Sequence, residues 1–166
     1  MELKEALGKL EESKEFKAWN KKTQDTFFSY AMKVIEENQE QPWNFGFYRK
    51  STDKIVAFTI DKEIEKQEEE EIFKQEDTEV KPIQIKEAEM PFWHVLEEVR
   101  EFTNKKYPNE LIKKTIAILQ NLEQYGAVWN ITFVTHSLNI INTKAGAKDG
   151  KILSDKIESI MNLIKK

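Results

Sequence analysis

Two stretches decide the fold: Trp43-Asn44-Phe45-Gly46-Phe47 and Trp129-Asn130-Ile131-Thr132-Phe133. In each stretch large apolar residues recur at every second position, which is the pattern of a β-strand with one buried face. Both stretches read Trp-Asn-x-x-Phe, and the second lies 86 positions after the first. A signature that recurs at a fixed offset predicts an internal duplication.

The segments around the two stretches follow the same order. Each stretch is preceded by a helix with paired aromatic residues, Phe16 with Trp19 and Phe92 with Trp93, and then by a β-rich segment and a polar loop. Each is followed by a turn and another strand. Strands that follow one another without helices between them indicate antiparallel hairpins. We therefore predict an α+β fold of two repeated units, each a helix packed on a small antiparallel sheet.

Local signals place the elements of the first unit. Apolar residues at helical spacing predict a helix over residues 3–22 with a break near Ser13, a residue type that favours the N-cap. Strands are expected over residues 27–35, 43–48 and 54–60. The proline of Gln41-Pro42 marks a boundary, because the residue before proline is disfavoured in the helical region.

The second unit is expected to begin with a helix over residues 91–105, since proline is tolerated in the first turn. Strands over residues 111–119, 129–134 and 139–145 follow, and Lys148-Asp149-Gly150 predicts a tight turn. Ser154 is then expected to cap a final helix. One face of that helix would carry Ile157, Ile160, Met161 and Ile164.

An acidic stretch separates the two units. Residues 61–81 hold ten acidic and four basic residues, which predicts a solvated linker with little contribution to the core. Within it, Ile72 and Phe73 are candidates for a short strand. Calcium binding or the docking of a basic partner by residues 68–71 is the alternative, but that run lacks the glycine that a sharp calcium-binding loop usually contains. The expected division is a first unit over residues 1–62, a linker over 63–82 and a second unit with the C-terminal helix over 83–166.

Composition excludes several classes of function. The chain has 166 residues, a formal net charge of −4 and no cysteine, so disulfides and thiolate chemistry are excluded. Only Arg49 and Arg100 could make bidentate contacts to phosphates or bases, so no nucleic-acid partner is expected. No apolar run approaches the length of a membrane helix, and the first residues lack a secretory core. We expect a cytoplasmic protein with no membrane partner.

The residues that could carry chemistry are few. His94, Glu97 and Glu98 share one face of a helix, but a metal site needs at least one further ligand, and the only other histidine, His136, is expected in a turn of the same unit. Ordinary surface positions are the favoured interpretation. Phosphate-binding loops, nucleophile elbows and metalloprotease motifs are absent. We predict a non-enzymatic chain with no catalytic, cofactor-binding or metal residues and no cofactor.

The stretch from Trp129 to Phe133, taken with residues 141–153, resembles the PepSY domain, a family of metalloprotease propeptides and small prokaryotic proteins. The resemblance covers residues 83–157, and residues 14–60 more weakly. It implies tandem PepSY-like, cystatin-like units with a binding or inhibitory role, and it supplies no catalytic residues. Gly146 stands where the family usually has aspartate, and Asp149 where threonine is common.

Two function hypotheses follow. The first is a non-enzymatic interaction or inhibitory module that holds a peptidase or another protein on a sheet edge or an open sheet face. The alternative is a small-molecule-binding protein, or an enzyme, with a pocket between helix and sheet near Asn44, Asn130 and His136. Trp43 and Trp129 could stack a ligand, although core positions are favoured. The chain is expected to be a monomer or a homodimer, according to where its C-terminal helix packs.

Overall fold

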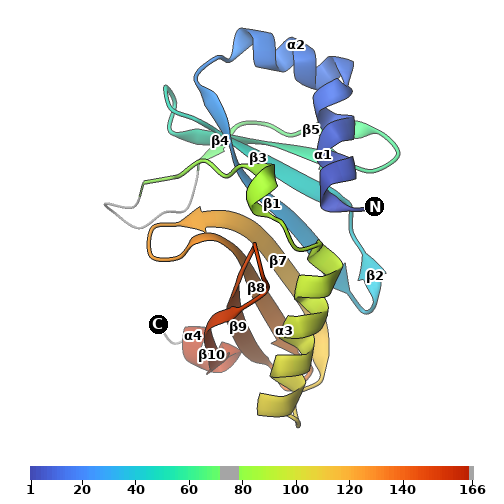
Figure 1. Cartoon of the computed structure of the whole chain (residues 1–166), viewed down its shortest axis with the longest axis vertical. Helices are drawn as coiled ribbons and strands as arrows, with labels where there is room; N and C mark the ends of the chain where they lie inside the picture. Colours follow the sequence, from blue (N-terminus) through green and yellow to red (C-terminus); the bar gives the residue numbers. More distant parts are fainter. Residues whose placement is uncertain (72–78, 165–166) are drawn as a thin grey trace.

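The computed structural model describes residues 1–71 and 79–164, and it has an α+β fold with one large antiparallel sheet (Figure 1). The strands of the first half are β1 (Thr26–Glu36), β2 (Gln39–Glu40), β3 (Trp43–Arg49), β4 (Lys54–Ile60), β5 (Ile64–Lys66) and β6 (Glu70–Glu71). Those of the second half are β7 (Ile112–Leu122), β8 (Gly126–Thr135), β9 (Asn139–Gly146) and β10 (Ile152–Ser159). The predicted strands over residues 27–35, 43–48, 54–60, 111–119, 129–134 and 139–145 are therefore confirmed.

The sheet runs through both halves of the chain in the order β10-β9-β8-β7-β1-β3-β4-β5, with β2 and β6 as short additions beside β1 and β4. Every pairing is antiparallel. The sequence predicts a separate small sheet for each unit, and this prediction is wrong. The structure joins the strands of both halves into one sheet, because β1 and β7 pair along most of their length. That correction could not be read from local patterns, since it concerns strands far apart in the chain.

The first helical segment is divided where the sequence indicates. α1 (Leu3–Glu12) and α2 (Lys14–Lys22) meet at Ser13, whose hydroxyl donates to the Leu10 carbonyl at 2.7 Å and accepts from the Phe16 amide at 3.2 Å. One side chain therefore closes the last turn of α1 and caps α2.

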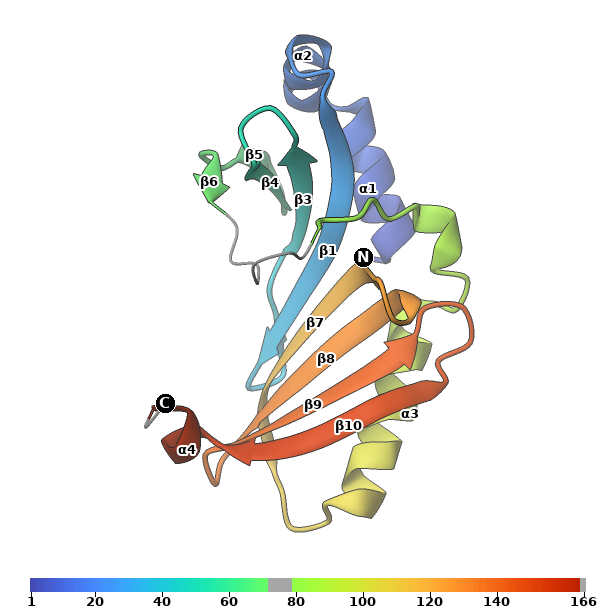
Figure 2. The ribbon, with the colours of Figure 1, turned by 90° about the vertical axis from the view of Figure 1, so that its left-hand side faces the viewer.

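The long helix of the second half is α3 (Phe92–Lys106), preceded by a short 3-10 turn, η1 (Ile85–Glu87). Pro91 is its N-cap residue, one position before the first helical residue. Figure 2 shows α1 and α3 on the same side of the sheet, while β6 and the short C-terminal helix α4 (Ile160–Ile164) lie toward the other side. Only one face of the sheet is covered by the long helices.

The hydrophobic core lies between the sheet and these helices. Phe92 at the start of α3 packs against both signature tryptophans, with ring-centre distances of 5.2 Å to Trp43 and 4.8 Å to Trp129, and the two tryptophan rings lie 6.2 Å apart. Both tryptophans are almost completely buried, at 1% and 0% exposure. Ala31 and Ala117, small residues on the two central strands, are buried on the same face. The prediction that Trp43 and Trp129 belong to the core is confirmed.

The strand registers of the two halves correspond. Ala31 is opposite Phe45 in the first half, and Ala117 is opposite Ile131 in the second, a shift of 86 positions for both partners. Met32 occupies the position that the same shift carries onto Ile118, and these two residues pair with each other where β1 meets β7. The pair of Met32 and Ile118 therefore lies midway between the two halves, at equivalent positions of the first long strand of each half.

The predicted C-terminal helix from Ser154 is wrong. Residues 152–159 form the edge strand β10, which pairs with β9, and the helix begins only at Ile160. The amide of Met161 donates to the Ser159 hydroxyl at 3.3 Å, so a serine does stand at the helix start, but five positions later than predicted. Pairing with β9 provides hydrogen-bond partners for the backbone groups of these residues. A short isolated helix is less favourable, because its first turn is costly to form.

The described part of the acidic stretch is largely exposed, as predicted. Part of the expected linker, however, forms β5 and β6, which pair with β4. Ile64 packs against the core, and the described carboxylates of this stretch are exposed or half-buried. The predicted strand at Ile72 and Phe73 lies outside the described residues.

Candidate functional site

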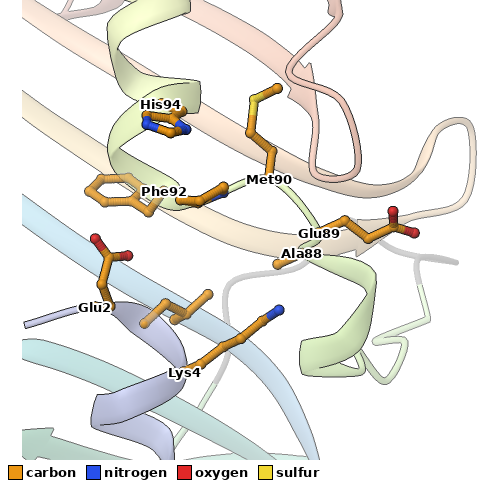
Figure 3. A pocket seen from close by; sticks show the side chains of 9 residues that line it. Glu2, Lys4, Ala88, Glu89, Met90, Phe92 and His94 are labelled. Carbon is orange, nitrogen blue, oxygen red and sulfur yellow. The ribbon is translucent and has the colours of Figure 1, made fainter.

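A cavity of about 460 Å³ opens between the first turn of α1 and the start of α3 (Figure 3). It is lined by Glu2, Leu3, Lys4, Ala88, Glu89, Met90, Pro91, Phe92 and His94. Figure 3 shows the side chains from α1 facing those from the α3 side across this space. The volume falls within the range of small-molecule pockets.

The cavity has an apolar floor and a charged rim. Leu3, Ala88 and Phe92 are buried, whereas Lys4 and His94 are exposed, as are the two lining glutamates. None of the lining residues carries a hydroxyl or a thiol, so the cavity offers no such nucleophile. The floor can contact apolar groups, and the rim presents charged side chains.

The second candidate is the face of the sheet that α1 and α3 leave uncovered, which we call the open face. Its centre holds four half-buried apolar side chains that we call the junction patch, Met32, Val34, Ile116 and Ile118. Met32 is opposite Ile118 and Val34 is opposite Ile116, so the four lie together across the β1–β7 pairing. Alternate residues of the same strands, such as Ala31 and Leu119, are fully buried under the helices.

An amide side chain flanks the junction patch on each side. On the first-half side, Asn44 accepts a hydrogen bond from the Tyr30 hydroxyl at 3.1 Å and donates to the Thr59 hydroxyl at 3.2 Å. Thr59 also accepts from the Gln67 side chain at 3.0 Å. These bonds hold Asn44 in one orientation on the open face.

Asn130 is held in a similar way on the second-half side. Its side-chain oxygen accepts from Asn142 at 2.6 Å, and the same Asn142 amide donates to Thr132 at 3.0 Å. The ammonium of Lys144 donates to the Asn142 oxygen at 2.9 Å. The asparagines of both Trp-Asn signatures thus project onto the open face, opposite to their buried tryptophan neighbours.

The two ends of the open face carry opposite charge. Glu65 pairs with Thr59 and Glu70 with Ile55, which places two carboxylates beside β4 at the first-half end. The second-half end carries two lysines, Lys144 and Lys156, and one carboxylate, Glu158. Burial and, to a smaller extent, the nearby positive charge of Lys156 lower the pKa of Lys144. Burial, followed by the negative charge of Glu70, raises the pKa of Tyr30.

The remaining candidates from the sequence are dispersed. His94, Glu97 and Glu98 are exposed on α3, and His136 is exposed after β8. In residues 1–71 and 79–164 no group of three or more histidine, cysteine or acidic residues could hold a metal ion. His136 instead lines a cavity of about 250 Å³ with Arg100. It is not brought together with the two asparagines of the open face.

The sequence did not indicate the junction patch or the cavity between the helix starts. Met32 and Ile118 are related by the same shift of 86 positions as the tryptophans, but that relation does not say that the two residues pair. The cavity depends on how α1 approaches α3, two segments that are far apart in the chain. No local periodicity encodes either arrangement.

No family model and no curated protein matches the chain. Among solved structures, the chain resembles the crystal structure of a "putative lipoprotein" from Clostridium difficile 630, with a TM-score of 0.55 and 14% sequence identity. The match covers 87% of this chain and 90% of that one. The structural comparison therefore supports the α+β fold. Within the described residues, no helix is both long and apolar enough to cross a membrane.

Proposed function

We propose that this chain is a non-enzymatic interaction module that holds a protein partner on the open face of its sheet. The observation that carries the proposal is the junction patch. Its four apolar side chains are left partly exposed, and the asparagines that flank them are oriented by hydrogen bonds. Apolar centres with polar surroundings are typical of protein interfaces.

The PepSY resemblance in residues 83–157 favours a peptidase as the partner, whereas a homodimer, the other expectation from the sequence, would make the partner a second copy of this chain. We assign the module no reaction, cofactor, nucleic-acid partner or membrane partner. A cytoplasmic location remains our prediction from the sequence. The lipoprotein description belongs to the structural neighbour and is not transferred to this chain.

We also infer that the two halves arose by duplication of one unit. The matching registers around Ala31 and Ala117 support this, as does the position of both Trp-Asn signatures on the strand that pairs with the first long strand of its half, β3 with β1 and β8 with β7. Asn44 and Asn130 pair with Met32 and Ile118, the two residues at the centre of the sheet. Superposition of the two halves on their strands is the test, and a poor fit of Trp43 onto Trp129 would refute the duplication.

Affinity capture from lysate of the source organism tests the interaction proposal. The native chain is compared with Ile118→Asp, which places a charge in the junction patch, and with Lys17→Asp, which introduces the same residue at an exposed position of α2. A protein retained by the native chain and by the α2 variant, but not by Ile118→Asp, supports binding at the open face. Equal retention by all three chains contradicts it. Circular dichroism of each variant establishes that it is folded.

A small-molecule-binding protein is the second candidate, and the cavity between α1 and α3 is the observation that favours it. Because the cavity joins elements of both halves, an occupant would contact the starts of two helices at once. A thermal-shift screen of apolar and amphipathic compounds tests this candidate. Shifts that disappear in Ala88→Trp, which fills the cavity, support it. Shifts that persist in that variant place the binding elsewhere.

A further inference from the structure

We propose that the occupant of the open face is a second copy of this chain, so that the protein forms a two-fold dimer with two sheets packed face to face. The inference rests on the proposed function, because it names the partner of the same surface. Three features of the open face carry it: its symmetric arrangement, its opposite charges and the exposed apolar helix at one corner.

The first feature is one row of side chains that crosses the sheet. Successive strand pairings align, in this order, Glu65, Thr59, Asn44, Met32, Ile118, Asn130 and Lys144. The β1–β7 pairing lies in the middle of the sheet, with three further strands on either side along the main path. A two-fold axis that runs parallel to the strands, in front of the open face and over this pairing, places each half of the row opposite the other half of the row in a second copy.

That axis brings compatible chemistry together. Met32 of one copy meets Ile118 of the other, which buries apolar surface from both. Asn44 meets Asn130, and side-chain amides offer both donors and acceptors to each other. Lys144 meets Thr59 and lies within the reach of a long side chain from Glu65, which pairs with Thr59 on the neighbouring strand. An isologous interface requires this kind of self-complementarity.

The second feature is charge. The first-half end of the face carries Glu65 and Glu70, and the second-half end carries two lysines, Lys144 and Lys156, with one carboxylate, Glu158, two residues further along β10. In the described residues neither lysine forms an ion pair, and Lys156 repels Lys144. The two-fold axis along the strands places each acidic end over the basic end of the other copy. An anionic membrane fits less well, since it attracts basic surfaces and would meet the two carboxylates.

The third feature is the exposed apolar surface of the C-terminal helix. Met161 and Ile164 in α4 are 54% and 72% exposed, and Leu138 beside them is 54% exposed. The amide of Ile160 donates to the Leu138 carbonyl at 2.9 Å, which joins these residues at one corner of the sheet. Figure 2 shows α4 on the side of the sheet away from α3, where a second copy would cover it. Exposed apolar groups that cluster in this way typically mark interaction surfaces.

Sedimentation equilibrium of the full chain, with a charge-swap series, tests the inference. Glu65→Lys and Lys144→Glu each place like charges together at two symmetric positions, so each should weaken dimerisation by about tenfold or more. The double variant restores opposite charges and should recover the native dissociation constant to within about threefold. Lys17→Glu on α2 is the control for a charge change elsewhere. Glu65 is exposed on a short edge strand, so its variant is expected to fold even if the Lys144 variant does not.

A concentration-dependent dimer that the single variants weaken and the double variant restores supports the inference. A dimer that neither reversal weakens overturns it, because the contact must then lie elsewhere, for example on the β10 edge. A native chain that sediments as a monomer at all soluble concentrations also overturns it. In that case capture of a partner that Ile118→Asp abolishes would preserve the proposed interaction function, and absence of any such partner would remove both proposals.

Discussion

The ring of Tyr30 lies directly against the α-carbon of Gly46 on the neighbouring strand, so that a β-carbon at residue 46 would overlap the ring. The hydroxyl of the same tyrosine donates to Asn44. Glycine is therefore required at this position because the tyrosine ring occupies the space of a side chain, and not because the backbone is left-handed. The contact also holds Tyr30, and with it Asn44, in place on the first-half side of the open face.

Gly46→Ala is expected to lower the free energy of unfolding by about 1–3 kcal/mol, because the added methyl group must displace the ring. Urea titration gives the change. Gly8→Ala in α1 is the matched control, since a β-carbon there meets nothing within 4 Å. That substitution should stabilise the protein by about 0.5–1 kcal/mol. A loss at residue 46 that persists undiminished in a Tyr30→Ala background would show that the ring is not its cause.

The contact between α3 and β10 is expected to depend on pH. Asp155 accepts hydrogen bonds from the Lys106 ammonium at 2.7 Å and from the Tyr107 hydroxyl at 2.8 Å. The bond from Lys106 is the main cause of the lowered pKa of the Asp155 carboxyl. Because this pKa is lower in the folded than in the unfolded state, the stabilisation is present above the unfolded value. It is lost as the pH falls toward the folded value.

Asp155→Asn should therefore lower the free energy of unfolding by about 1–2 kcal/mol at neutral pH. The difference from the native chain should shrink below about pH 4, the ordinary pKa of aspartate. Chemical denaturation at a series of pH values measures it. Tyr107→Phe keeps the lysine contact and should show a smaller loss with the pH dependence largely retained. A difference that is constant down to strongly acidic pH would contradict the assignment.

Ser13→Ala is expected to cost about 1 kcal/mol of stability, since α2 loses the side chain that caps its first turn. Ser13→Asp keeps a side-chain acceptor and should lie close to the native chain. Thermal denaturation followed by circular dichroism compares the three. If alanine and aspartate were equally destabilising, the hydroxyl bond to the Leu10 carbonyl, and not the cap, would be the stronger contribution.

The two signature tryptophans differ in one respect that a matched pair of variants can measure. The indole nitrogen of Trp43 donates to the Met1 carbonyl at 2.9 Å, whereas that of Trp129 is buried without a hydrogen-bond partner in the described residues. Phenylalanine removes similar volume at both sites. Trp43→Phe should therefore destabilise the protein by about 1 kcal/mol more than Trp129→Phe. Equal losses would indicate that the bond to Met1 contributes nothing.

Much of the local structure could be predicted from the sequence. The alternation around Phe45 and Ile131 predicts strands because one face of each is buried, and Ser13 marks the break between two helices because its hydroxyl can satisfy free backbone groups. These signals act over a few residues. They can therefore be recognised in the sequence of a segment without knowing what that segment packs against.

Two arrangements could not be predicted. The spacing of Ile157, Ile160, Met161 and Ile164 fits a helix, but β9 offers residues 152–159 a complete hydrogen-bonding partner, and the helix keeps only the last part. Likewise nothing near Met32 indicates that it pairs with Ile118. Both outcomes depend on partners distant in the sequence, and so does the open face that carries the candidate site.

The pairing of β1 with β7 has a consequence for how the chain is made. β1 leaves the ribosome early, and it can pair at once with β3 on one side, whereas its other side must wait until α3 and β7 have been synthesised. During that interval the edge of β1 that will later pair with β7 is unprotected and can pair with other chains. Rapid translation through the acidic stretch and α3 would shorten this exposure, and pausing there would favour misassembly.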